Sequence, residues 1–381
     1  MPLSKNSTFA LPSTHKAVAF SANAPNPLTE IITVPTSPPN DTQVLIKVNS
    51  IALNPTDWKH FAAGWGSKGS ILGTDSSGIV VSVGSKVTKF KIGDFVGAFT
   101  HGGYKQDPNG GSFQEYVAVD ENLCLKYENL VESSEVTNYS LPVGQVSTFE
   151  GAAAVNLGLA TIGMSFFQLK LEPFADSQKN EWILIWGGAT ATGLLAIQVA
   201  KKIYGLNVIT TASGKHHALL KKLGADEVVD YRDSDAIDKV KQLTDNNIKY
   251  ALDSVSSVET YNQTNECLRS TGEAYLDNLL AVPSDALKNK KSNVTLASTL
   301  VYAVEGVPVD LNGAKIPVMS AVVDAHRKFY PLINKYVSNG EILHQPLKFL
   351  PGGLSGVNDG LELLKKGVSG EKLILRIQDT K

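Results

Sequence analysis

A run of small residues at 187–193 could bind phosphate through its backbone. The run reads Gly-Gly-Ala-Thr-Ala-Thr-Gly; an apolar segment, 182–186, precedes it, and apolar residues at helical spacing, 194–200, follow it. A backbone without large side chains can approach the oxygens of a pyrophosphate. The first turn of the next helix offers N–H groups and the positive end of the helix dipole. Strand, turn and helix in this order are typical of the start of a dinucleotide-binding βαβ unit.

The turn departs from the strict G-x-G-x-x-G pattern, because Thr190 occupies the position of the middle glycine. On the pattern alone, a tight strand-to-helix turn in any α/β protein fits equally well. A second strand-like segment, 207–211, follows at roughly the distance that a nucleotide-binding unit requires. We therefore expect cofactor contacts from the turn and from the end of a further predicted strand, 250–255. These residues are Gly188, Ala189, Thr190, Ala191, Thr192, Gly193 and Val255.

The end of the second strand indicates which nicotinamide dinucleotide is bound. An NAD-dependent enzyme usually has a carboxylate there, which binds the ribose 2′-hydroxyl. Residues 211–217 read Thr-Ala-Ser-Gly-Lys-His-His and contain no carboxylate. Ser213, Lys215 and His216 instead suit a 2′-phosphate, so we predict NADPH rather than NADH. The alternative for these side chains is a solvated loop.

Composition excludes several classes of function. The chain has 381 residues, a net charge of −2 and no basic run, so we expect no nucleic-acid partner. It has no apolar stretch long enough to cross a bilayer and no signal-peptide core near residue 1, so we expect a cytoplasmic protein without a membrane partner. The two cysteines, Cys124 and Cys267, are too few for a four-cysteine zinc lobe and are most simply buried apolar residues.

The predicted secondary structure changes in type along the chain. Short strand-like segments separated by Gly and Asp turns, between residues 15 and 125, predict a compact β barrel or sandwich. From residue 182 strands alternate with helical patterns, which predicts a parallel sheet covered by helices. The last strand-like segment is 372–377.

Several motifs in this order resemble the zinc-independent branch of the medium-chain dehydrogenase/reductase superfamily, which includes quinone oxidoreductases, enoyl reductases and fungal aldehyde reductases. The resemblance implies an α/β protein with a GroES-like β-barrel catalytic domain, 15–147 and 318–381, and a Rossmann-type doubly wound domain, 148–317. It also implies a monomer or a homodimer. The motifs are 54–59 (NPTDWK), 73–78 (GTDSSG), 93–97 (GDFVG), 111–116 (GSFQEY), the 187–193 turn, 223–226 (LGAD) and 369–373 (SGEKL).

The departures from zinc-dependent members of the superfamily concern the metal ligands. Those members have a cysteine at the position of Asn54, and a histidine in a Gly-His-Glu triplet that is Gly73-Thr74-Asp75 here. The resemblance therefore implies a site with no metal, in which hydrogen-bond donors must stabilise the negative charge that develops on a substrate oxygen.

The resemblance also suggests roles for single residues. Lys59 would polarise a carbonyl group or relay a proton, although a surface lysine on a first helical turn is an equal alternative. Asn54 would contact the substrate or the nicotinamide ribose, unless it only forms an Asn-Pro turn. Tyr104, in a glycine-rich loop, would act as an acid. Further cofactor contacts would come from Thr161 at the carboxamide, Tyr231 at the 2′-phosphate, Tyr302 at the nicotinamide and Lys372.

Three functions fit these features. The first is NADPH-dependent reduction of activated C=C bonds, in enones or enoyl groups, or of quinones. The second is NADPH-dependent reduction of aldehydes. The third is a sensor that binds NADPH without catalysis, which Thr190 in the turn leaves open. Turnover of a small carbonyl or enone substrate distinguishes the first two from the third.

Overall fold

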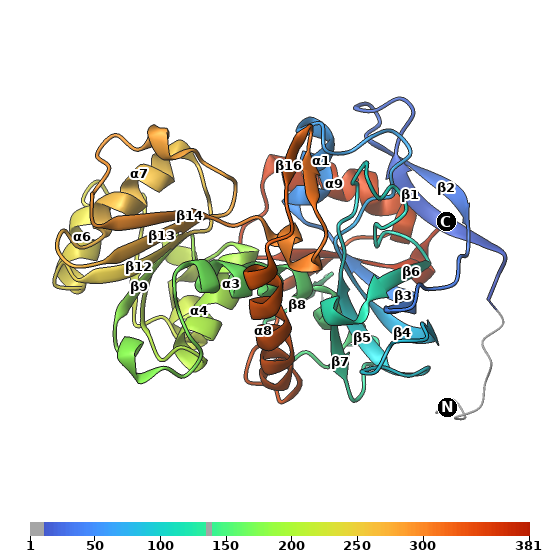
Figure 1. The fold of residues 1–381 in the computed structure, drawn as a ribbon, viewed down its shortest axis with the longest axis horizontal. Helices are drawn as coiled ribbons and strands as arrows, with labels where there is room; N and C mark the ends of the chain where they lie inside the picture. Colours follow the sequence, from blue (N-terminus) through green and yellow to red (C-terminus); the bar gives the residue numbers. More distant parts are fainter. Residues whose placement is uncertain (1–10, 135–138) are drawn as a thin grey trace. The chain divides into compact units, whose positions relative to one another are not determined.

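The computed structural model describes residues 11–134 and 139–381, which form two compact units (Figure 1). The β-rich unit consists of the described residues up to Leu157 together with Glu305–Met319 and Tyr330–Lys381. The parallel-sheet unit consists of Gly158–Val304 and Ser320–Phe329. No helix in the described ranges is long and apolar enough to cross a membrane.

The β-rich unit is built on a curled sheet that joins distant parts of the chain. Among the described residues this sheet has eight strands, antiparallel except for the pair β17–β18. β18, near the end of the chain, lies between β3 and β17. The strands in order are β7 (Cys124–Tyr127), β5 (Phe95–Phe99), β4 (Asp75–Val83), β3 (Gln43–Ala52), β18 (Lys372–Arg376), β17 (Leu347–Phe349) and β8 (Ser140–Leu141), with β6 (Tyr116–Asp120) paired to β3.

Smaller elements complete this unit. Two antiparallel strand pairs are β1 (Thr14–Phe20) with β2 (Thr29–Pro35), and β15 (Val309–Leu311) with β16 (Ala314–Ile316). The helices are α1 (Pro55–Ala62), α2 (Phe149–Ala153), α9 (Val357–Lys366) and the C-terminal part of α8 (Ser320–Ser338).

The parallel-sheet unit has the strand order of a doubly wound nucleotide-binding fold. Six strands of the described chain run parallel, and their order along the sheet corresponds to 3-2-1-4-5-6 in the chain. In sheet order they are β11 (Glu227–Val229), β10 (Asn207–Thr211), β9 (Trp182–Trp186), β12 (Ile248–Asp253), β13 (Ala274–Asn278) and β14 (Val294–Ser298). The helices are α3 (Asn156–Gln168), α4 (Ala191–Lys202), α5 (His217–Leu223), α6 (Ala236–Leu243) and α7 (Val258–Cys267).

The predicted fold class is confirmed. The central strands of the parallel sheet are apolar and buried, as expected for a sheet covered on both faces: Leu184, Ile209, Ala251 and Leu276 are fully buried. The curled sheet of the other unit is the predicted β-barrel part.

The predicted domain boundaries at 148 and 318 stay predictions, beside the limits of the two compact units. Residues 148–157 and 305–317 group with the β-rich unit. The first of these segments is held there because the hydroxyl of Ser77 donates to the carbonyl of Phe149 at 2.5 Å, and Arg376 binds the buried carboxylate of Glu150 at 2.6 Å. Residues 320–329 group with the parallel-sheet unit, where the ring of Phe329 packs closely against Gly163.

Candidate active site

The turn after β9 is shaped by two of its glycines. A side chain at Gly188 would collide with the hydroxyl of Thr210 on β10, and one at Gly193 would collide with the backbone of Gly187 and Gly188. The turn therefore lies directly against the neighbouring strand and the first turn of α4. Along the chain, β9 is the first strand of this sheet and β12 the fourth, and the two are neighbours in the sheet. The strand order therefore reverses between them, and the turn lies at the carboxyl end of β9 beside this point. Ligands usually bind at this position in such a fold.

Thr190, the residue that replaces the middle glycine, caps α4. Its hydroxyl accepts a hydrogen bond from the backbone N–H of Gly193 at 2.9 Å, and it lies 3.0 Å from the hydroxyl of Ser254, which follows β12. Ser254 in turn donates to the carbonyl of Trp186 at 2.7 Å. Thr190 thus lacks the backbone freedom of a glycine, but its side chain caps α4 and links β9 to β12 through Ser254. Ala189, Ala191 and Thr192 are half-buried, and Val255 is exposed.

The loop after β10 contains the three residues predicted to bind a 2′-phosphate. Lys215 is exposed, while Ser213 and His216 are half-buried. Burial, and to a smaller extent the neighbouring Lys215 and His217, lower the pKa of His216. His216 is therefore neutral at pH 7, and Lys215 provides the positive charge of this loop.

The structure adds two charged residues that the sequence reasoning missed. The carboxylate of Asp230, which follows β11, accepts the backbone N–H of Gly214 at 3.0 Å, so a carboxylate does lie beside this loop. It is paired with the guanidinium of Arg232, at 2.9 Å from Nε and 2.5 Å from Nη2, and these hydrogen bonds lower the pKa of Asp230. Tyr231 between them is exposed. The sequence signal for this charged pair was the tripeptide Asp-Tyr-Arg, residues 230–232, directly after β11.

Two further residues of the parallel-sheet unit are predicted to contact the cofactor. Thr161 is buried within α3, and Tyr302 is buried in a short 3-10 helix, Val301–Glu305. Their contacts with a nicotinamide stay predictions.

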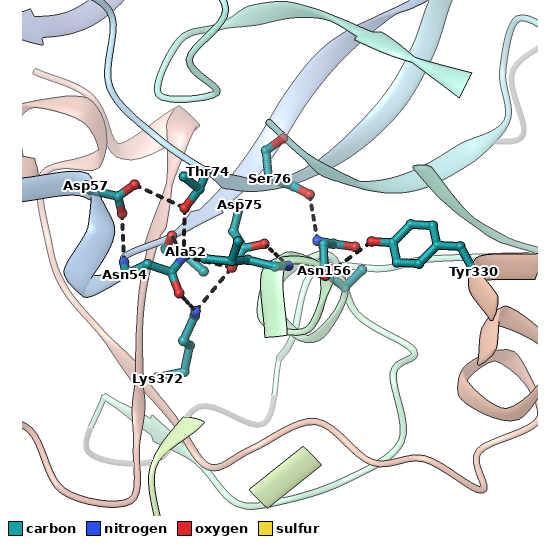
Figure 2. A network of polar contacts seen from close by, with 11 residues as sticks. Ala52, Asn54, Asp57, Thr74, Asp75, Ser76, Asn156, Tyr330 and Lys372 are labelled. Carbon is teal, nitrogen blue, oxygen red and sulfur yellow. Dashed lines mark hydrogen bonds and ion pairs between the residues drawn. The ribbon is translucent and has the colours of Figure 1, made fainter. Parts of the chain in front are cut away.

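In the β-rich unit, Asn54 begins α1 and anchors a buried polar network (Figure 2). The carboxylate of Asp57 accepts the backbone N–H of Asn54 at 2.7 Å and the hydroxyl of Thr74 at 3.0 Å. The amide nitrogen of Asn54 donates to the hydroxyl of Thr74 at 3.0 Å and to the carboxylate of Asp75 at 2.8 Å. Burial raises the pKa of Asp57 to about 7.

Lys372, the first residue of β18, supplies the cation of this network. Its ammonium donates to the amide oxygen of Asn54 and lies 3.1 Å from the carboxylate of Asp75. The other oxygen of Asp75 accepts the backbone N–H of Leu157 at 2.7 Å. The structure therefore brings together two of the predicted site residues, Asn54 and Lys372, and gives both a structural role. Their contacts with substrate or cofactor stay predictions.

The remaining two catalytic candidates lie in different surroundings. Lys59 is half-buried on α1; burial lowers its pKa, and its ammonium lies 5.7 Å from the centre of the Trp58 ring. Tyr104 is buried, its hydroxyl accepts the backbone N–H of Asp310 at 2.6 Å, and its ring stacks on His101 at 3.9 Å. Burial raises the pKa of Tyr104. Lys59 is thus the better proton donor of the two at neutral pH.

The residues at the position of the zinc ligands do not fit a zinc ion. Asn54 and Thr74 offer an amide and a hydroxyl, neither of which is among the thiolate, imidazole and carboxylate ligands that zinc usually takes, and the carboxylate of Asp75 is already paired with the ammonium of Lys372. Within the part of the chain that the structure describes, no group of three His, Cys, Asp or Glu side chains could hold a metal ion.

The fold and the nucleotide turn define a class of oxidoreductase in which a GroES-like β domain accompanies a doubly wound dinucleotide-binding domain. Two family descriptions match the chain: "Alcohol dehydrogenase GroES-like domain" over residues 40–129 and "Zinc-binding dehydrogenase" over residues 191–298. The chain belongs to the medium-chain dehydrogenase/reductase superfamily, as the sequence motifs indicated.

Relatives at more than 30% identity support this assignment. An uncharacterized protein of Saccharomyces cerevisiae is 37% identical over 342 residues, covering 87% of this chain and 90% of its own length. The trans-enoyl reductase ACTTS2 of Alternaria alternata is 33% identical over 343 residues, covering 88% and 92%. The enoyl reductase component of lovastatin nonaketide synthase, lovC of Aspergillus terreus, is 31% identical over 355 residues, covering 88% and 89%.

Solved structures share the fold. The quinone oxidoreductase of Coxiella burnetii superposes with a TM-score of 0.67 at 24% identity, covering 95% of this chain and 99% of that one. The CurK enoyl reductase superposes with a TM-score of 0.71 at 15% identity, covering 96% and 99%.

Proposed function

We propose that this protein is a zinc-independent, NADPH-dependent reductase of C=C bonds conjugated to a carbonyl group, and of quinones. The observation that carries the proposal is the buried network of Asn54, Asp75 and Lys372, in which an amide and a carboxylate paired with an ammonium stand at the position where zinc-dependent members bind their metal. Relatives named as a trans-enoyl reductase and as an enoyl reductase component support the substrate class.

One group of residues would bind the cofactor, and Lys59 would bind the substrate. The turn with Gly188 and Gly193, at the N-terminus of α4, fits the pyrophosphate. Lys215 and Ser213 would bind the 2′-phosphate. When bound, NADPH supplies a hydride. Lys59 would donate a hydrogen bond to the carbonyl oxygen of the substrate as electrons from the double bond move onto it; its lowered pKa makes it a stronger proton donor.

Aldehyde reduction is the second candidate, because an ammonium such as that of Lys59 could also protonate an alkoxide. The experiment that separates the candidates offers cinnamaldehyde and NADPH in the presence of a chelator and identifies the product. We expect 3-phenylpropanal, the product of C=C reduction. Cinnamyl alcohol would instead establish carbonyl reduction, and no turnover of enones, quinones or aldehydes would favour a sensor. Activity that depends on added zinc would contradict the metal-free mechanism.

A further inference from the structure

Two buried histidines of the β-rich unit have no part in the function proposed so far. His60 lies on α1 and is fully buried, and His101, which follows β5, is 6% exposed. Their Nε2 atoms are 3.0 Å apart. Burial, together with the proximity of His101, lowers the pKa of His60 to about 3, and burial lowers the pKa of His101 to about 3. Both rings are therefore neutral at physiological pH, and one Nε2 must donate to the other.

The contacts of His60 determine the direction of this hydrogen bond. Nδ1 of His60 lies 2.9 Å from the backbone carbonyl of Thr56 and 3.0 Å from its hydroxyl. A carbonyl only accepts, so Nδ1 of His60 bears the proton and its Nε2 is the acceptor. His101 then bears its proton on Nε2, and its Nδ1 is an acceptor. That Nδ1 lies 3.8 Å from the carboxyl group of Glu305.

Glu305 can supply a proton to this acceptor. Its side chain is 15% exposed; burial, with smaller contributions from the negative charges of Asp107 and Asp120, raises its pKa to about 8, so it is protonated at neutral pH. The negative charge of Asp107 also raises the pKa of His101, against the larger effect of burial, and the negative charge of Asp310 raises the pKa of Tyr104. The separation of 3.8 Å exceeds a hydrogen bond, so transfer requires the carboxyl group to approach by about 1 Å.

Aromatic rings enclose the pair of histidines. The ring of Trp65 meets His60 edge to face, with centroids 5.3 Å apart, and the ring of Tyr104 stacks on His101 with centroids 3.9 Å apart. His60 is fully buried and His101 is 6% exposed, so a proton can pass directly from one imidazole to the other across the 3.0 Å between their Nε2 atoms.

We propose that His60 and His101 form a proton relay that connects Glu305 to the Thr56 hydroxyl and delivers the proton that the reduced substrate takes up. This inference rests on the proposed function. After hydride addition, Thr56 gives its hydroxyl proton to the enolate and regains one from Nδ1 of His60. Nε2 of His60 takes the proton of His101 Nε2, Nδ1 of His101 takes that of Glu305, and Glu305 is reprotonated by solvent. The sum is one proton consumed for each hydride. Each transfer leaves both histidines in the opposite tautomer, so both rings must rotate back to the resting arrangement before the next turnover.

The delivery point coincides with the catalytic candidate on α1. Thr56 and Lys59 are three positions apart, so they are neighbours on one face of the helix, while Thr56 and His60 are four apart. The relay therefore ends at the face that presents Lys59.

The test compares His101→Gln with a matched control, His15→Gln. His15 is also 6% exposed, and its ring nitrogens bind Thr36 at 2.8 Å and Gln114 at 2.9 Å, outside the relay. With an enone and saturating NADPH, we expect His101→Gln to lower kcat at least tenfold and to raise the solvent deuterium isotope effect on kcat, with KM for NADPH unchanged. His15→Gln should leave all three quantities near wild type. Equal effects of the two variants, or a fall in kcat with no change in the isotope effect, would overturn the relay.

Two further measurements keep the relay separable from the proposed function. The kcat of the wild type should fall above about pH 8 as Glu305 loses its proton, and Glu305→Gln should have a low kcat without this fall; a wild-type profile retained in the variant contradicts the relay. Nitrogen NMR of labelled histidines needs no turnover: at pH 7 we expect His60 as the neutral Nδ1–H tautomer. An Nε2–H tautomer or an imidazolium would refute the relay, whereas inactivity toward enones, quinones and aldehydes would refute only the function.

Discussion

Lys59 is the residue on which the proposed chemistry most depends. It is half-buried, and burial lowers its pKa. Lys59→Ala removes the proposed donor to the substrate oxygen, so we expect kcat to fall about 10²-fold or more while the Kd for NADPH stays unchanged. The control is Lys68→Ala, an exposed lysine of the same unit. An unchanged kcat in Lys59→Ala removes this residue from the mechanism.

Lys215 tests the choice of cofactor. A charge-assisted hydrogen bond to a phosphate contributes about 1.5–3 kcal/mol, so Lys215→Ala should raise KM for NADPH roughly 10- to 150-fold and leave KM for NADH nearly unchanged. Lys222→Ala, another exposed lysine of the same unit, serves as the control. Equal increases of KM for both cofactors would exclude a 2′-phosphate contact.

For single residues, the sequence indicates which side chains could belong to the site but not which residues they contact. The glycines of the turn could be predicted because their spacing reflects a local backbone requirement. The Asp230–Arg232 pair was missed because its contact with Gly214 depends on how β10 and β11 pair. Asn54 and Lys372 were each predicted as site residues, but the two are 318 residues apart in the sequence. No local pattern encodes their contact.

At the scale of elements, β18 connects the end of the chain to the polar network. Lys372→Met leaves the buried carboxylate of Asp75 without its cation. We expect the free energy of unfolding to fall by about 3–5 kcal/mol, measured by urea titration. Lys348→Met on the adjacent β17 is the control.

A double variant makes the interpretation specific. Adding Asp75→Asn to Lys372→Met removes the unpaired charge and should restore a large part of the lost stability. If the double variant is as unstable as the sum of the two single variants, the ion pair is not the source of the effect.

Elements with strong local patterns could be predicted from the sequence. The parallel sheet could be predicted from the alternation of apolar strand-like segments with helical patterns. The signal is strong because each strand is buried on both faces and is therefore continuously apolar. The division of the chain depended on contacts such as Arg376 with Glu150, which join residues far apart in sequence.

For the whole molecule, a buried acid makes stability depend on pH. Asp277 in β13 is fully buried and accepts the hydroxyl of Thr299 at 2.6 Å; burial raises its pKa from 3.8 to about 7. The folded protein therefore keeps this proton up to about pH 7, while the unfolded chain releases it near pH 4. The contribution to stability is complete below pH 4 and is lost as the pH rises to 7.

Asp277→Asn removes this titration without changing the shape of the side chain. Relative to the wild type, the variant should gain stability between pH 4 and pH 7, by on the order of 4 kcal/mol. Urea titrations at several pH values measure the change, with the exposed Asp285→Asn as the control. A stability difference that is constant across this range would contradict protonation of Asp277 in the folded state.

The position of β18 between β3 and β17 also sets an order on biosynthesis. Asn54 leaves the ribosome 318 residues before Lys372, a delay of roughly 15–60 s at 5–20 residues per second. During this time the part of β3 that pairs with β18, Ser50–Ala52, has no strand beside it on that side, and Asp75 has no ammonium beside it. The parallel sheet, whose strands all lie between residues 182 and 298, is complete before then. All strands of the parallel sheet are thus synthesised before the curled sheet of the β-rich unit can be completed.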